Sequence, residues 1–136
     1  MSDIFNIPLM ILPERYAVCR LAQDAPFPDW ARPGDLVALV RTSDELSVLC
    51  LERYVPPEVK AELGWRVIRV QGPLDFSYVG VLSSIAAPLA QAGVSIFAVS
   101  TYDTDYILVK ENSLDQAVEA LNMAGFLVLN HVRLSS

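Results

Sequence analysis

The chain has 136 residues, of which 53% are hydrophobic, and a net charge of −6 at pH 7. This length and composition suffice to bury the core of one domain or of two small ones. A negative charge with interspersed acids and bases does not suit a duplex nucleic-acid interface, so we expect no nucleic-acid partner. A single histidine, His131, leaves almost no material for a zinc site or a histidine-based triad. We therefore expect no cofactor and no metal.

The pattern of apolar residues predicts a chain of short strands and helices. Expected strands, in chain order, are 8–12, 14–21, 36–42, 46–53, 65–71, 94–99, 105–110 and 126–132. Expected helical segments are a short turn over 29–32, a short helix over 56–63, and two longer helices over 77–92 and 114–124. Pro56 and Pro57 open the short helix, and Gly64 follows its end. Asp75 or Ser77 is expected to cap the first long helix.

Three local features carry further expectations. Ser113 and Gln116 have the spacing of a capping box, in which each side chain bonds a free amide of the other residue. Cys19 and Cys50 lie alone in apolar stretches, which predicts reduced, buried cysteines in a cytoplasmic protein. The first 16 residues lack a basic region followed by a full hydrophobic core, so we expect no signal peptide.

The segment from 76 to 102 carries no charge and is bracketed by Asp75 and Asp103. A membrane span is one interpretation of so long an uncharged segment. Serines, a proline and a glycine interrupt it, however, and no basic cluster flanks it. Gly93 also separates a helical pattern from a strand pattern, so the segment predicts a buried helix and strand of a soluble protein. The polar loops 72–75 and 100–105, where this segment surfaces, are the expected working edge.

From Trp65 onward the predicted order is βαββαβ, and the first half repeats that order in degenerate form. The hairpins 36–53 and 94–111 both turn through Ser, Thr and Asp residues. We therefore expect a domain over 1–62 and another over 63–136. We also expect the two hairpins to be related by an approximate two-fold axis, each contributing its polar corner to a shared cleft.

The βαββαβ order, the helix sequence from Val79 to Ile96 and the corner from Ser100 to Leu108 resemble the ACT domain, a regulatory amino-acid-binding module. The stretch from Ile96 to Leu108 is similar to aspartate kinase regulatory domains. The stretches from Trp65 to Phe76 and from Ser100 to Leu108 also resemble small bacterial tandem-ACT proteins and the ACT repeats of a eukaryotic cytosolic arginine sensor. The resemblance implies an α+β fold of two ferredoxin-like ACT units side by side. In that fold the N-terminal unit is degenerate, and antiparallel sheets carry their helices on one face.

The resemblance further implies a non-catalytic sensor that holds an amino-acid-like ligand between two ACT units. Asp105 matches a ligand-contacting aspartate of the arginine sensor, whereas Asp75 and Tyr78 replace its glycine and glutamate. Independently of the family, free amides at a helix N-terminus suit a carboxylate, and an aspartate suits an ammonium group. The predicted ligand-binding residues are Asp75, Phe76, Ser77, Tyr78, Val79, Gly80, Ser100, Thr101, Asp103, Asp105, Thr42, Ser43 and Glu45.

Other interpretations remain open from the sequence. Asp105 also suits a solvated turn, and Asp103 with Asp105 suits a metal site that lacks a placed third ligand. The chain also suits a protein-interaction module with a vestigial ligand site, or an enzyme that uses the two aspartates. A homodimer and a protein partner are open alternatives alongside the amino-acid ligand, and no membrane partner is expected.

Overall fold

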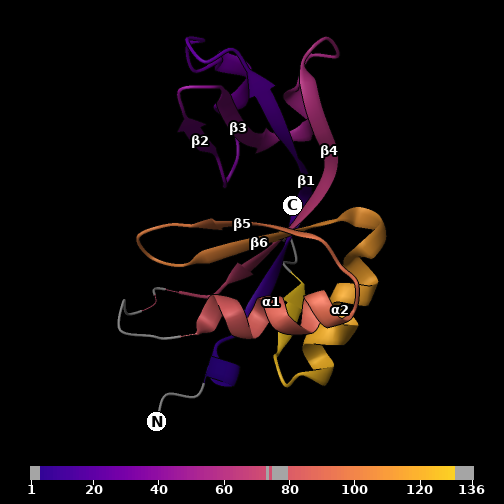
Figure 1. The fold of residues 1–136 in the computed structure, drawn as a ribbon. Coiled ribbons are helices and arrows are strands. Elements are labelled where there is room, and N and C mark those ends of the chain that lie inside the picture. The colour runs from indigo at the N-terminus through magenta and orange to yellow at the C-terminus, as the bar shows by residue number, and fades with distance from the viewer. Residues whose placement is uncertain (1–3, 73, 75–79, 131–136) are drawn as a thin grey trace, which may run out of the picture. The chain divides into compact units, whose positions relative to one another are not determined.

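The computed structural model describes residues 4–72, 74 and 80–130, which belong to two compact units (Figure 1). The C-terminal unit comprises Met1–Pro13 and Arg66–Ser136, and the N-terminal unit comprises Glu14–Trp65. The unit boundaries fall inside two strands, β1 (Leu9–Leu21) and β4 (Lys60–Val70). The division into domains over 1–62 and 63–136 stays a prediction.

In the C-terminal unit the strand order is β7-β1-β4-β6-β5. The strands not yet given are β5 (Ile96–Ser100), β6 (Asp105–Lys110) and β7 (Val128–Asn130). β5 and β6 form the expected antiparallel hairpin, whereas β7 pairs with β1 in parallel. The antiparallel sheet expected for this unit is therefore wrong in one respect. A strand from the start of the chain lies between β4 and β7, because Leu9 and Ile11 of β1 belong to the same core.

Both α-helices of the C-terminal unit cover the same face of its sheet, as predicted (Figure 1). They are α1 (Val81–Gln91) and α2 (Leu114–Met123). The core between helices and sheet contains Leu9, Ile11, Ile68, Val70, Val81, Ile85, Leu89, Val94, Ile107, Val109, Ala117, Leu121 and Phe126. None of the helices in the described part of the chain is long and apolar enough to cross a membrane.

The predicted helix caps differ from the observed ones. α1 begins at Val81 with Gly80 as its N-cap, whereas Asp75 and Ser77, the predicted caps, lie outside the described residues. The capping box expected at the start of α2 is absent, because Ser113 ends a 3₁₀ turn and makes no side-chain cap bond. Gln116 instead donates its Nε2 hydrogen to the carbonyl oxygen of Ala92, 2.6 Å away.

The N-terminal unit, all of whose residues are described, contains no α-helix. Its hairpin of β2 (Ala38–Arg41) and β3 (Leu46–Leu51) confirms the expected one, and β3 pairs with β1. The helix predicted over 56–63 is wrong. A single turn, closed by the Val59 amide on the Pro56 carbonyl, is followed by β4, which begins at Lys60.

The shorter segments of the chain are three-residue 3₁₀ turns. They are η1 (Ile4–Asn6), η2 (Asp29–Ala31), η3 (Glu52–Tyr54) and η4 (Glu111–Ser113). η2 confirms the short helical turn expected over 29–32. The two strands expected over 8–12 and 14–21 form the single strand β1. Pro13 lies between the residues that pair with β7 and those that pair with β3, so neither ladder needs its missing N–H group. Cys19 and Cys50 are free and buried, as predicted.

Candidate functional site

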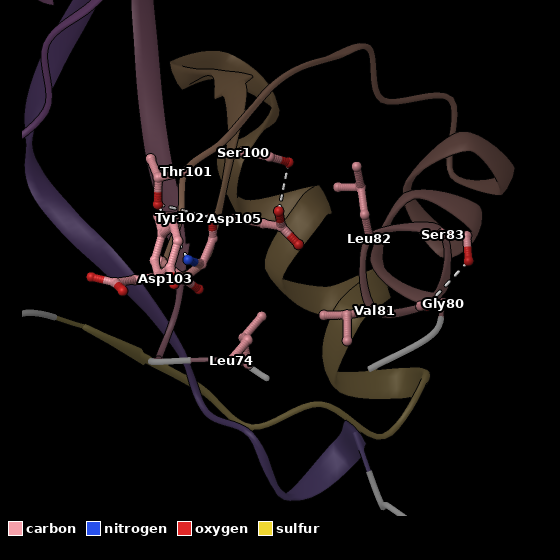
Figure 2. Close-up of a pocket in the computed structure, with 11 residues that line it drawn as sticks. Leu74, Gly80, Val81, Leu82, Ser83, Ser100, Thr101, Tyr102, Asp103 and Asp105 are labelled. Atoms are coloured by element: carbon pink, nitrogen blue, oxygen red, sulfur yellow. Dashed lines mark hydrogen bonds between the residues drawn. The ribbon is translucent and has the colours of Figure 1, made fainter. Parts of the chain in front are cut away.

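A cleft of about 560 Å³ opens in the C-terminal unit between the β5–β6 corner and the start of α1 (Figure 2). Its size lies in the range of about 300–1,000 Å³ that small-molecule sites occupy. The lining residues are Leu74, Gly80, Val81, Leu82, Ser83, Ser100, Thr101, Tyr102, Asp103, Thr104 and Asp105. One wall is thus a polar strand corner, and the other is the N-terminus of a helix with apolar side chains.

Asp105 is the acidic group that faces into this cleft. It is the first residue of β6 and pairs across the hairpin with Ser100, the last residue of β5. The side chains of a strand alternate between its faces, so Asp105 lies on the helix-covered face that Ile107 supplies to the core. The Ser100 hydroxyl donates to Oδ1 of Asp105 at 2.6 Å. That bond fixes the carboxylate, whose two oxygens can together accept about four hydrogen bonds.

The two aspartates of the corner do not converge. Figure 2 shows the Asp105 carboxylate directed toward the side of the cleft that carries Leu82, and the Asp103 carboxylate directed the opposite way. Within the described part of the chain no cluster of three or more His, Cys, Asp or Glu side chains could hold a metal ion. Among the described lining residues, the cleft therefore presents one inward carboxylate rather than an Asp-x-Asp pair.

The β5–β6 corner is held by a short network of hydrogen bonds. The Thr101 amide donates to the Thr104 carbonyl at 2.8 Å, and the Thr104 amide donates to Thr101 Oγ1 at 3.2 Å. The Leu74 amide donates to the Asp103 carbonyl at 2.7 Å, which ties the loop before α1 to the same corner. Two segments that border the cleft are therefore connected directly through the backbone.

Thr104 is a functional residue that the sequence did not single out. Its side chain is 3% exposed, and its hydroxyl donates to the carbonyl oxygen of Val70, the last residue of β4, at 2.6 Å. A Cβ placed on the neighbouring Gly72 would lie 3.0 Å from both the Asp103 carbonyl oxygen and Thr104 Cβ. The corner thus packs closely on the end of β4. A threonine between two aspartates has the sequence signature of an exposed turn, so no local signal predicts its burial.

The N-terminus of α1 supplies hydrogen-bond donors to the other wall. Gly80 adopts a left-handed conformation, with φ at 81°, and its carbonyl accepts from the Ser84 amide and the Ser83 hydroxyl. The first amides of a helix have no carbonyl partner within it and carry the positive end of the helix dipole. Here they belong to Val81, Leu82 and Ser83. Residues 76–79, which were predicted to line the same end of the site, lie outside the described residues.

The structure brings together only part of the predicted site. The residues that do line the cleft are Gly80, Ser100, Thr101, Asp103 and Asp105. The predicted residues Asp75, Phe76, Ser77, Tyr78 and Val79 lie outside the described residues. Thr42, Ser43 and Glu45 form the β2–β3 corner of the other unit, the N-terminal one, where the Thr42 amide donates to the Glu45 carbonyl. Their contribution to a shared site stays a prediction.

The C-terminal unit has the element order β4-α1-β5-β6-α2-β7, with both helices on one face of its sheet, which is the order of a ferredoxin-like domain. The model of the ACT domain family matches residues 60–123, and a model of an N-terminal domain matches residues 14–58. The crystal structure of the Agobacterium tumefaciens protein Atu0741 is 37% identical and superposes with a TM-score of 0.88, covering 96% of this chain and 97% of that one. The chain belongs to the ACT domain family, as its sequence predicted.

Two further relatives carry functional names. The human cytosolic arginine sensor for mTORC1 subunit 1 is 40% identical over 58 residues, which is 42% of this chain and 18% of the sensor. The chain therefore matches less than a fifth of the length of this curated relative. The regulatory subunit of aspartate kinase from Thermus thermophilus is 12% identical with a TM-score of 0.57, covering 88% of this chain and 95% of that one, and shows the fold alone.

Proposed function

We propose that this chain is a non-catalytic, cytoplasmic regulatory protein that binds an amino acid in the cleft beside α1. The observation that carries the proposal is the inward Asp105 carboxylate, in a cleft that the N-terminus of α1 also lines. The similarity to a cytosolic arginine sensor and the fold shared with a regulatory subunit support a sensing role. The resemblance adds that a second ACT unit completes the site.

The two ends of the cleft complement the two charged groups of an amino acid. The ligand ammonium donates to Asp105, whose geometry the Ser100 hydroxyl already fixes. The ligand carboxylate accepts from the first amides of α1, those of Val81 to Ser83, where the helix dipole favours an anion. The same constellation offers little to a simple anion, because Asp105 would repel it.

The hydroxyls around the cleft are engaged in structural bonds. Those of Ser83 and Thr104 donate to the carbonyls of Gly80 and Val70, and that of Ser100 donates to Asp105. The Ser100–Asp105 pair also has the form of a nucleophile and a base. Turnover of a bound amino acid would favour that enzymatic alternative, whereas binding without turnover favours a sensor.

The test begins with a thermal-shift screen of the twenty amino acids, followed by calorimetric titration of each stabilising one. Asp105→Asn keeps the size of the side chain and removes its charge. Truncating one partner of a buried charge pair costs about 2–5 kcal/mol. Asp105 is partly exposed, so we expect the lower end, about 2 kcal/mol or roughly thirty-fold in Kd.

Asp103→Asn is the matched control, because it removes the same charge from a carboxylate directed to the opposite side from that of Asp105. We expect its Kd to stay within about threefold of the wild type. An Asp105→Asn variant that also stays within threefold would make Asp105 an ordinary turn residue. Absence of stabilisation by all twenty amino acids would instead favour the second candidate, an interaction module with a vestigial site.

A further inference from the structure

We infer that the cleft selects amino acids with an apolar side chain and rejects those with an acidic one. This inference rests on the proposed function and adds the class of ligand. The class of ligand follows from the lining residues that do not bind the ammonium or the carboxylate of the amino acid, because these residues would contact its side chain.

The part of the cleft not used by the charged groups is apolar. Leu74, Val81 and Leu82 point toward the same space as Asp105 (Figure 2). Val81 is 6% exposed and belongs to the core of the C-terminal unit, and the other two pack against that core. A ligand side chain lying on these three residues is removed from water against a fixed hydrocarbon wall, which favours an apolar group.

The charges of this region exclude an acidic side chain. The described residues that line the cleft include no lysine or arginine, so each of them is neutral or acidic. The carboxylate of a bound aspartate or glutamate side chain would find no cationic partner there. It would lie either on the apolar wall or near Asp105, and both positions penalise a negative charge.

A basic side chain is also poorly matched. Asp105 is taken by the α-ammonium, and the Asp103 carboxylate is directed to the opposite side from that of Asp105. A second ligand cation would therefore lack an inward carboxylate among the described lining residues. Both charged classes thus bring a group that the lining leaves without a partner, whereas an aliphatic side chain does not.

The test is a calorimetric panel on the wild-type protein. The apolar probes are L-leucine, L-isoleucine and L-valine, the acidic probes are L-aspartate and L-glutamate, and the basic probes are L-lysine and L-arginine. We expect the best apolar probe to bind at least about thirty-fold more tightly than the best acidic probe. We expect a margin of at least about tenfold over the best basic probe. An acidic or basic probe that binds as tightly as the best apolar one would overturn the inference.

A single substitution should invert the selectivity. Leu82→Lys places an ammonium group on the apolar wall, so the Kd ratio of L-glutamate to L-leucine should fall by at least tenfold. Gln91→Lys adds the same charge at the other end of α1, outside the lining residues, and should leave the ratio unchanged. Equal ratios in the two variants would refute the assignment of this wall to the ligand side chain.

The panel separates failure of the inference from failure of the proposed function. If a basic or acidic amino acid is the tightest ligand and Asp105→Asn weakens it, the amino-acid site stands and the apolar selectivity is wrong. If none of the seven probes binds and the wider screen also finds no ligand, both are wrong.

Discussion

Thr104→Val removes one buried hydroxyl while nearly preserving the shape of the side chain. That hydroxyl donates to the Val70 carbonyl at 2.6 Å, and the residue is 3% exposed. Because valine fills the same space, the substitution reports on the hydrogen bond and creates no cavity. The bond joins the β5–β6 corner, which carries Asp105, to the end of β4.

The expected loss follows from the burial of the bond. A typical intramolecular hydrogen bond contributes about 0.5–1.5 kcal/mol, and a buried acceptor left without its donor costs about 1–3 kcal/mol. We expect the free energy of unfolding to fall by about 1–3 kcal/mol. At roughly 4 °C for each kcal/mol in a chain of this size, the melting temperature should fall by about 4–12 °C.

Two measurements check the expectation. Urea denaturation gives the change in stability, and amide hydrogen exchange at Leu74 reports on the corner itself, because that amide donates to the Asp103 carbonyl. Thr104→Ser keeps the hydroxyl and should preserve most of the Leu74 protection. Thr42→Val removes a hydroxyl that accepts from Asp44 and Glu45 at an exposed corner, and should cost less than about 1 kcal/mol.

The reasoning would be refuted if Thr104→Val stayed within about 0.5 kcal/mol of the wild type with unchanged exchange at Leu74. In that case the buried hydroxyl would contribute nothing to the corner. Loss of Leu74 protection in Thr104→Ser as large as in Thr104→Val would also contradict it, because the serine variant retains the donor.

Two further predictions concern packing and thiol chemistry. Gly72→Ala places a methyl group 3.0 Å from the Asp103 carbonyl oxygen and should lower the free energy of unfolding by about 1–3 kcal/mol. The measurement is the melting temperature, which should fall. An unchanged melting temperature would show that the corner shifts to accommodate the methyl group without loss of stability. A hydrogen bond with Cys19 and burial raise the pKa of Cys50, which keeps this thiol protonated up to alkaline pH. Because both cysteines are at most 1% exposed, Ellman's reagent should label them slowly until denaturant is added, and rapid labelling of the native protein would contradict the buried pair.

The sequence by itself determined the local elements of the C-terminal unit. A short apolar run, Tyr106 to Val109, predicted the strand over 105–110, which the structure confirms to the residue, and the polar corner before it predicted the hairpin. Helical spacing predicted α1 and α2 on one face of the sheet. These features depend on residues a few positions apart, whose pattern fixes which side of an element meets the core.

The same local signals failed where a distant partner decided the outcome. Two prolines and a glycine predicted a helix over 56–63, yet β4 begins at Lys60, inside that range, and continues to Val70. Gln116 was expected to cap α2, but its side chain donates instead to the carbonyl of Ala92, which lies 24 residues away in the chain. A propensity of a few tenths of a kcal/mol per residue cannot outweigh such tertiary contacts.

Only the tertiary structure decided which strands are neighbours and which polar groups are buried. Nothing in the periodicity of β7 specifies β1 as its partner, because alternation fixes a strand's faces and leaves its neighbour open. The sequence pattern does not distinguish Asp103 from Asp105. In the structure the Asp105 carboxylate is directed toward the side of the cleft that carries Leu82, and the Asp103 carboxylate is directed the opposite way. Thr104 became buried because its hydroxyl met a carbonyl 34 residues earlier, a pairing that exists only once the corner closes on the end of β4.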